Sequence, residues 1–208
     1  MKTINVKVTF IEPVLGMSPS NENIYRDFIG SKAPDAANVE EEVEALGVEA
    51  YTEKQMTVFP RTEEGEPFVW DYQIKGFFKD ACGGLRKVKG TESSKIKAYK
   101  KEIDKLIFPE PRKILFENYG EIGECQRPLR AQTAQGERIS LAISEEIKAG
   151  ASINFGVVCF CDENEKLVRE WLDYGRYSGF AQWRNSGKGR FLWEELDDSG
   201  NVIGGNAN

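Results

Sequence analysis

The segment 175–193 combines the residue types that bind nucleic acids. It holds four glycines and no acidic residue, and its cations are Arg176, Arg184, Lys188 and Arg190. Tyr177, Gln182 and Trp183 lie among these cations. Arginine and lysine bind phosphate, aromatic rings stack on bases, and glycine lets a backbone turn sharply or approach a ligand. The pattern indicates a nucleic-acid-binding loop that leads into a strand, although the same glycines could serve tight turns with Trp183 in the core.

Further cations fall in two other segments. Lys75-Gly76 follows an alternating stretch, 68–74, and precedes a helical apolar pattern that carries Lys79 and Arg86. At a strand-to-helix junction, free backbone N–H groups and a cation favour an anion. The second segment, which the sequence indicates is a loop between strands, contains Arg127, Arg130 and Arg138. These side chains could bind phosphates, or they could be solvated and paired with nearby glutamates.

The net charge of −6 conceals a strong asymmetry along the chain. Residues 1–74 carry 6 cations and 14 anions, residues 75–113 carry 12 and 5, and residues 114–208 carry 10 and 15. The three segments therefore have net charges of −8, +7 and −5. A basic segment within an acidic chain indicates a defined anionic partner rather than general adhesion to anions.

The absence of histidine restricts the chemistry available to this chain. Ser-His and Cys-His nucleophile pairs are excluded, and so is a histidine general base. Cys159 and Cys161 have no histidine to complete a zinc site, and we expect reduced core cysteines. We therefore expect no enzyme activity, no metal and no cofactor. Asp173 and Tyr174, near the glycine-rich loop, would be the candidates in a histidine-free nuclease.

Hydrophobic periodicity predicts the elements that position these residues. Thr3–Phe10 alternates with period two, 152–160 is a continuous apolar run, and 190–196 follows the glycine-rich loop, so all three are expected strands. Helices are expected over 162–174 and over the lysine-rich stretch 91–106. Strands outnumber those that two βαβ crossovers need, which favours an α+β fold with an antiparallel sheet.

The chain is long enough for one domain, which we place at 1–196. We expect an acidic helical insertion at 20–50, a basic helical insertion at 87–113 and a flexible tail at 197–208, since this tail is rich in Gly and Asn. No apolar run approaches the roughly 20 residues of a membrane-spanning helix, and the N-terminus has no signal-peptide core. These features predict a cytoplasmic protein.

Three features resemble the RAMP superfamily, the ferredoxin-like (RNA-recognition-motif-like) backbone subunits of CRISPR effector complexes. A first strand opens into a Pro/Gly loop at 6–16, a lysine-glycine pair precedes a helix at 74–86, and a glycine-rich loop at 179–191 precedes the last strand. The resemblance implies a ferredoxin-like sheet with helices on one face. It also implies nucleic-acid binding along the sheet and through the loop, with Lys75, Lys79, Arg184, Lys188 and Arg190 as contacts.

The resemblance does not imply cleavage, because RAMP nucleases often use a histidine or a loop aspartate. The acidic net charge departs from a dedicated RNA-binding subunit and fits a stand-alone or viral relative. We therefore expect a non-catalytic protein that binds RNA or single strands, with protein subunits or self-association as further partners. The alternative is a structural protein that docks on, or inhibits, a nucleoprotein complex through its acidic surface. In the first hypothesis, Lys75, Arg130 and Arg184 converge on one groove.

Overall fold

A computed structural model describes residues 1–20, 56–133 and 136–207, without the side chains of 129–140. The expected acidic insertion at 20–50 lies almost wholly outside the described residues. No helix among the described residues has both the length and the apolar character needed to span a bilayer.

The main sheet is antiparallel and is built around β1 (Lys2–Phe10), which pairs with β10 (Ser152–Cys159) and β11 (Phe191–Leu196). β12 (Val202–Gly205) pairs with β11, while β6 (Ile107–Glu110) and β7 (Lys113–Glu117) pair with β10. β5 (Phe68–Trp70) extends the sheet beyond β7. The predicted strands at 3–10, 152–160 and 190–196 are confirmed. β12, in contrast, lies within the segment that we predicted to be a flexible tail.

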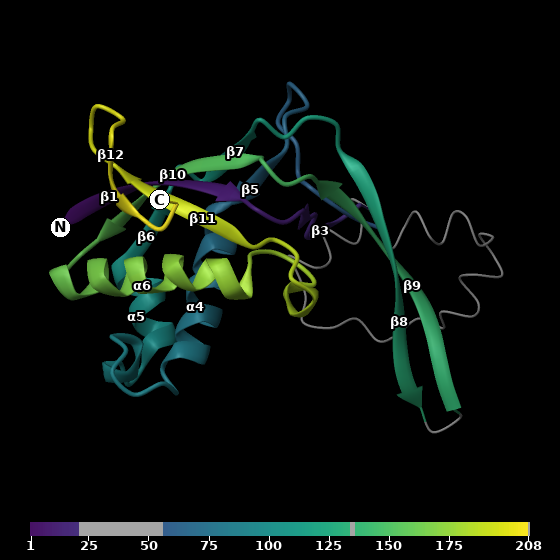
Figure 1. Cartoon of the computed structure of the whole chain (residues 1–208), viewed down its shortest axis with the longest axis horizontal. Coiled ribbons are helices and arrows are strands. Elements are labelled where there is room, and N and C mark those ends of the chain that lie inside the picture. The colour runs from purple at the N-terminus through teal and green to yellow at the C-terminus, as the bar shows by residue number, and fades with distance from the viewer. Residues whose placement is uncertain (21–55, 134–135, 208) are drawn as a thin grey trace.

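Two helical connections determine the strand order. The chain leaves β1, passes through α4 (Asp71–Leu85) and α5 (Tyr99–Leu106), and reaches β6 on the far side of β10. From β10 it passes through α6 (Asp162–Ser178) to β11, on the far side of β1. α4, α5 and α6 lie on one face of the main sheet (Figure 1). The fold is therefore α+β, as predicted.

The core lies between this sheet and the helices. Alternation on β1 buries Ile4, Val6, Val8 and Phe10, each about 1% exposed. The centroid of the Phe10 ring lies 5.9 Å from that of Phe116 and 6.1 Å from that of Phe191. On α4, Ile74, Phe77, Phe78, Ala81 and Cys82 recur at helical spacing and are buried. These residues form one buried face of α4, and the opposite face of the helix does not take part in the core.

The start of α4 corrects two sequence expectations. The strand expected over 68–74 ends at Trp70, and the helix begins at Asp71. Gln73 Oε1 accepts a hydrogen bond from the Trp70 backbone N–H at 2.8 Å, which caps the helix without the usual Ser, Thr or Asp. Lys75-Gly76 is consequently in the second turn, where the backbone N–H groups are used within the helix. The predicted anion site at a strand-to-helix junction is wrong.

A long hairpin projects from the body of the protein (Figure 1). Its strands are β8 (Gly123–Thr133) and β9 (Gly136–Ile147). At the base of the hairpin, the short strands β2 (Val14–Leu15) and β4 (Thr57–Val58) pair with β9. A further short strand, β3 (Ser18–Pro19), pairs with β4. We had predicted a loop flanked by strands for 127–138, but 127–133 are in β8, Pro128 included, and 136–138 are in β9. β8 pairs only with β9 among the described strands, and an edge strand tolerates proline.

Only part of the predicted basic helical insertion is helical. Within 87–113 the helical residues are a 3-10 turn, η1 (Ser93–Lys95), and α5, after which Ile107 begins β6. The lysine-rich helix expected over 91–106 is therefore only partly helical. The buried Ile103 fixes α5 against the core, so its lysines face outward. Helix α6, in contrast, continues four residues beyond the predicted end at Tyr174 and includes Arg176 and Tyr177.

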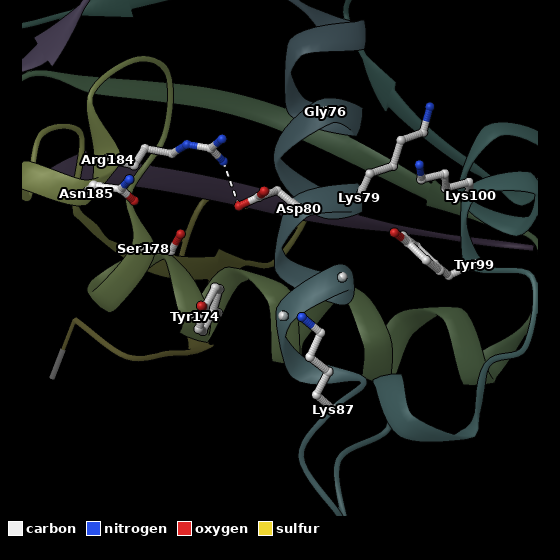
Figure 2. A pocket seen from close by; sticks show the side chains of 12 residues that line it. Gly76, Lys79, Asp80, Lys87, Tyr99, Lys100, Tyr174, Ser178, Arg184 and Asn185 are labelled. Carbon is white, nitrogen blue, oxygen red and sulfur yellow. Dashed lines mark ion pairs between the residues drawn. The ribbon is translucent and has the colours of Figure 1, made fainter. Parts of the chain in front are cut away.

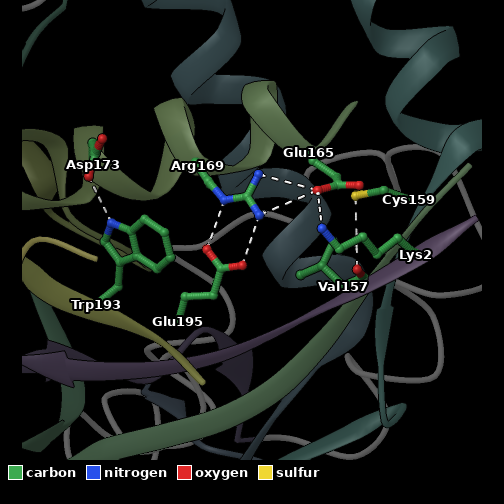
Figure 3. Close-up of polar contacts among 8 residues, drawn as sticks. All are labelled: Lys2, Val157, Cys159, Glu165, Arg169, Asp173, Trp193 and Glu195. Carbon is green, nitrogen blue, oxygen red and sulfur yellow. Dashed lines mark hydrogen bonds and ion pairs between the residues drawn. The ribbon is translucent and has the colours of Figure 1, made fainter. Parts of the chain in front are cut away.

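An ion-pair network joins α6 to the sheet (Figure 3). Arg169 on α6 donates from Nε and Nη2 to the two oxygens of Glu195 on β11, both at 2.8 Å. Glu165 accepts from Arg169 and from Lys2 of β1 at 3.3 and 3.1 Å. Asp173 Oδ1 accepts from Trp193 Nε1 at 2.8 Å. Asp173, which we had considered for catalysis, is thus part of the contact between the last helix and the last long strand.

Candidate nucleic-acid interface

The open face of α4 forms the floor of a groove. Residues 76, 79, 80, 83, 84 and 87 recur at helical spacing, and α5, α6 and the loop after α6 form the walls. The cavity has a volume of about 780 Å³. We call it the α4 groove, and its lining residues are Gly76, Lys79, Asp80, Gly83, Gly84, Lys87, Tyr99, Lys100, Tyr174, Ser178, Arg184 and Asn185 (Figure 2).

Two glycines bring tyrosine hydroxyls against the floor of the α4 groove. A Cβ added at Gly83 would lie 3.3 Å from Tyr99 Oη, and one added at Gly84 would lie 3.3 Å from Tyr174 Oη. Any larger residue at either position would have to displace its tyrosine. The glycines therefore keep the groove deep and place a tyrosine from α5 and another from α6 at its sides.

The lining of the α4 groove is positively charged. Its cations are Lys79, Lys87, Lys100 and Arg184, against a single acid, Asp80. Asp80 Oδ2 lies 2.7 Å from Arg184 Nη1, and Lys79 Nζ lies 2.6 Å from Asp104 Oδ1 outside the lining. Lys87 and Lys100 have no ion-pair partner in the part of the chain that the structure describes. These two ammonium groups are available to an anionic ligand.

Some of the predicted contact residues belong to this groove and others do not. Lys79 and Arg184 line it, and the Arg86 guanidinium lies over the Tyr99 ring at 5.2 Å. Lys75 lies outside the lining. Its ammonium is 4.1 Å from the centroid of the Phe108 ring and donates to the Asp104 carbonyl at 3.2 Å. Burial lowers the pKa of Lys75.

A second group of predicted residues attaches the glycine-rich loop to the hairpin. Arg127, only 7% exposed, donates from Nη2 to Gln182 Oε1 at 2.9 Å, and its Cζ lies 4.9 Å from the centroid of the Trp183 ring. Gln182 in turn donates to the Gly16 carbonyl at 3.0 Å. Lys188 pairs with Glu146 of β9 at 2.6 Å. In this arrangement Arg127, Gln182, Trp183 and Lys188 hold the loop in place.

The remaining predicted residues lie at the surface or beyond the described side chains. Arg176 and Tyr177 are exposed in the last turn of α6, and Tyr177 is 69% exposed. Arg190 is exposed, and its carbonyl accepts from the backbone N–H groups of Ile11 and Glu12. Arg130 and Arg138 are in β8 and β9, and their side chains lie outside the described residues.

The groove that we predicted from Lys75, Arg130 and Arg184 does not form in that way. Lys75 packs against Phe108, and Arg184 is paired with Asp80. The reason is that Lys75 is inside helix α4 rather than at its start, so it contacts α5 and β6. The positive groove that does exist draws its free cations, Lys87 and Lys100, from the basic segment 75–113.

The glycines of the loop serve backbone packing. A Cβ at Gly179 would lie 2.4 Å from the Lys188 carbonyl oxygen, and one at Gly189 would lie 2.0 Å from that of Phe180. Both glycines also have positive φ, 73° and 70°. The Phe180 N–H donates to the Gly189 carbonyl at 2.8 Å. Of the two explanations that the sequence left open for these glycines, tight turning accounts for Gly179 and Gly189.

Lys87, Lys100 and Tyr99 were missed as candidate site residues. One sequence signal could have found the floor: Gly76, Gly83 and Gly84 share a helical face with Lys79 and Lys87, opposite the buried face of α4. The contribution of α5 depends on tertiary packing and has no such signal.

Comparison with solved structures finds distant structural similarity. No protein-family model matches the chain, and no curated protein matches it. A chain in the cryo-electron microscopy structure of the Type III-B Cmr-beta complex bound to cognate target RNA superposes with a TM-score of 0.48 and 11% sequence identity. The alignment covers 94% of this chain and 58% of that chain.

Proposed function

We propose that this protein is a non-catalytic nucleic-acid-binding protein that takes RNA or single-stranded DNA in the α4 groove. The observation that carries the proposal is the excess of positive charge in this cavity, four cations against one acid. Two of those cations, Lys87 and Lys100, lack an ion-pair partner among the described residues. Neutralising phosphates with such groups releases condensed counterions, which is the main source of affinity for nucleic acids.

The tyrosines of the groove favour a single strand over a duplex. Tyr99 and Tyr174 flank the floor of the cavity, from α5 and α6. Single strands expose the faces of their bases, and protein aromatic rings stack on them at about 1–3 kcal/mol per base. A duplex keeps its bases stacked inside and could offer this cavity only its phosphates.

We further propose a ferredoxin-like, RAMP-like topology for the main sheet. The order β11-β1-β10-β6, with α4 and α6 as crossovers on one face, supports it. The open face of the sheet is less suited to RNA than that family resemblance implied. On that face Lys7 of β1 pairs with Glu194 at 3.8 Å, and Asn154 of β10 donates to Glu117 at 2.9 Å. We therefore assign the nucleic acid to the helical side.

The test is fluorescence anisotropy with labelled single-stranded RNA, single-stranded DNA and duplex over a salt series. Wild-type protein should bind the single strands at low salt. The double variant Lys87→Ala/Lys100→Ala removes two phosphate contacts, so the slope of log K against log salt should fall by about 1.4. Lys148→Ala, an exposed lysine in the β9–β10 turn, is the control.

Two outcomes would overturn the proposal. One is the absence of binding to any single strand at low salt. The other is a salt slope that the double variant leaves equal to that of the Lys148→Ala control. Intact RNA and DNA after incubation with and without a divalent cation are expected, since we assign no catalytic residue.

A further inference from the structure

The connection between α4 and α5 is attached to α6 through one carboxylate, that of Glu170. Glu170 Oε1 accepts a hydrogen bond from the Glu92 backbone N–H at 2.7 Å, and Oε2 accepts one from the Ser93 backbone N–H at 2.9 Å. Oε2 also accepts a hydrogen bond from the Ser93 hydroxyl. The first N–H groups of a helical turn such as η1 have no partner within it. One side chain of α6 therefore satisfies three donors at the start of η1.

The Ser93 hydroxyl extends this contact into the core. Ser93 is 0% exposed, and its Oγ accepts a hydrogen bond from Trp171 Nε1 at 2.9 Å. Trp171 is itself buried, and its ring packs on that of Phe78 of α4 with centroids 5.4 Å apart. We call Glu170, Ser93 and Trp171 the η1 clamp. Hydrogen bonds to a charged group are about twice as strong as those between neutral groups, so Glu170 is the strongest part of this clamp.

The carboxylate of Glu170 has no ion pair within residues that the structure describes. Its charge is met instead by the two backbone N–H groups and the hydroxyl of η1. Without the carboxylate, partly buried donors at Glu92 and Ser93 would be left without an acceptor, which is costly. The start of η1 is therefore held against α6 by this one group.

The first turn of α5 depends on this attachment. Ala98, which precedes the helix, makes no side-chain capping hydrogen bond, so the helix start has no cap of its own. Tyr99 and Lys100 are in this first turn. The second turn is anchored separately, because Ile103 is buried and Asp104 pairs with Lys79 of α4. A loss of the clamp should thus displace Tyr99 and Lys100 and leave the end of α5 in place.

Glu170 also lies on the face of α6 that forms the opposite wall of the α4 groove. Glu170, Tyr174 and Ser178 are spaced four residues apart, which places them on one face of the helix. Tyr174 and Ser178 line the groove from α6, and Tyr99 and Lys100 line it from α5. The two tyrosines lie on either side of α4 (Figure 2). The η1 clamp therefore connects the two walls of the groove.

We infer that Glu170 is a positioning residue of the α4 groove, whose carboxylate fixes the first turn of α5 and so holds Tyr99 and Lys100 opposite α6. The inference rests on the proposed function. Charge alone predicts the opposite effect of removing Glu170, because the loss of an acidic group makes a protein less repulsive to a polyanion. The direction of the change in affinity therefore separates positioning from electrostatics.

The first experiment measures binding of labelled single-stranded RNA by anisotropy at low salt. In Glu170→Gln the amide presents a single oxygen, so one donor of η1 faces an NH₂ group. The variant should bind about fivefold to tenfold more weakly than the wild type, as expected for the loss of a phosphate contact or a stacking contact. Glu163→Gln, exposed in the first turn of α6, removes the same charge from the same helix and is the control. Binding by Glu170→Gln that equals or exceeds that of the control would overturn the inference.

Two lysine substitutions then show which wall has moved. In the wild type, Lys87→Ala and Lys100→Ala should each lower the slope of log K against log salt by about 0.7. In the Glu170→Gln background, Lys87→Ala should keep this effect, since Lys87 follows α4, whereas Lys100→Ala should have none. Retention of both effects would show that α5 has not moved, and loss of both would show a global change. Either result would contradict a positioning role.

Amide hydrogen exchange, measured by mass spectrometry without nucleic acid, tests the clamp independently of binding. Amides in 92–102 should exchange about tenfold faster in Glu170→Gln than in Glu163→Gln, the effect of one lost hydrogen bond to a charged group. Those in 103–106 should be unchanged. Equal exchange of 92–102 in the two variants would overturn the inference even if the groove binds RNA. If neither lysine substitution alters binding by the wild type, the proposed function fails instead, whatever the exchange shows.

Discussion

The guanidinium of Arg184 is paired with the carboxylate of Asp80 inside the α4 groove, with Nη1 and Oδ2 2.7 Å apart (Figure 2). Both side chains are partly exposed, at 34% and 47%. A pair of this kind contributes little to stability, since solvent screens it. Its main effect is on the charge of the groove, because Asp80 neutralises Arg184, one of the four cations in the lining.

Asp80→Asn should therefore strengthen nucleic-acid binding. The substitution frees Arg184 for a phosphate and removes a repelling charge, so affinity for single strands should rise about threefold to tenfold at low salt. The slope of log K against log salt should steepen by about 0.7, the value for one added phosphate contact. Asp198→Asn, in an exposed turn near the C-terminus, controls for the change in net charge. Equal affinities for the Asp80 and Asp198 variants would contradict this assignment of Arg184.

The floor of the groove can be tested with two glycine substitutions in α4. A Cβ at Gly76 would meet no atom within 4 Å, so Gly76→Ala should raise the free energy of unfolding by about 0.5–1 kcal/mol. A Cβ at Gly84 would crowd Tyr174 Oη at 3.3 Å. Gly84→Ala should gain less stability and should weaken single-strand binding by displacing that tyrosine. Urea unfolding and anisotropy measure the two effects, and identical behaviour of the two variants would exclude a role for the close tyrosine contact.

The contact between α6 and β11 makes stability depend on pH. Hydrogen bonds from Arg169 lower the pKa of Glu195 below its usual value. A carboxyl group whose pKa is lower in the folded state stabilises the protein above its unfolded pKa. That stabilisation is lost as pH falls through the folded pKa. Glu195→Gln should thus cost about 1.5–3 kcal/mol at neutral pH and much less in acid.

Urea unfolding of the wild type and the Glu195→Gln variant at pH 7 and pH 3 measures this difference. Glu194→Gln is the matched control, because its carboxylate lies 3.8 Å from Lys7 in a longer and weaker pair. A destabilisation by Glu195→Gln that is equally large at both pH values would show that the loss comes from packing and not from the ion pair (Figure 3).

The apolar periodicity of the sequence was enough to predict several elements. The alternation in β1, the continuous apolar run of β10 and the helical spacing in α6 depend on neighbouring residues in the chain, and all three elements formed. The start of α4 was misplaced because the cap is a backbone-to-Gln73 contact. The hairpin was missed because its pairing of β8 with β9 puts Pro128 in a strand at the edge of a sheet, and the sequence alone does not show which strands lie at an edge.

What the sequence by itself determined is the buried face of each element, since the apolar period of a strand or helix is a local property. It also determined that positive charge is concentrated in the segment that forms α4 and α5. Which charges remain available was decided only by the tertiary structure. Arg184 meets Asp80 across more than a hundred residues, and Lys188 meets Glu146 on a distant strand. Lys87 and Lys100 line the same groove, and neither has an ion-pair partner among the described residues. An ion pair forms only when two side chains come within a few ångströms of each other in space. The distances between residues far apart in the sequence are set by the folded structure, so the sequence alone does not show which charges are paired.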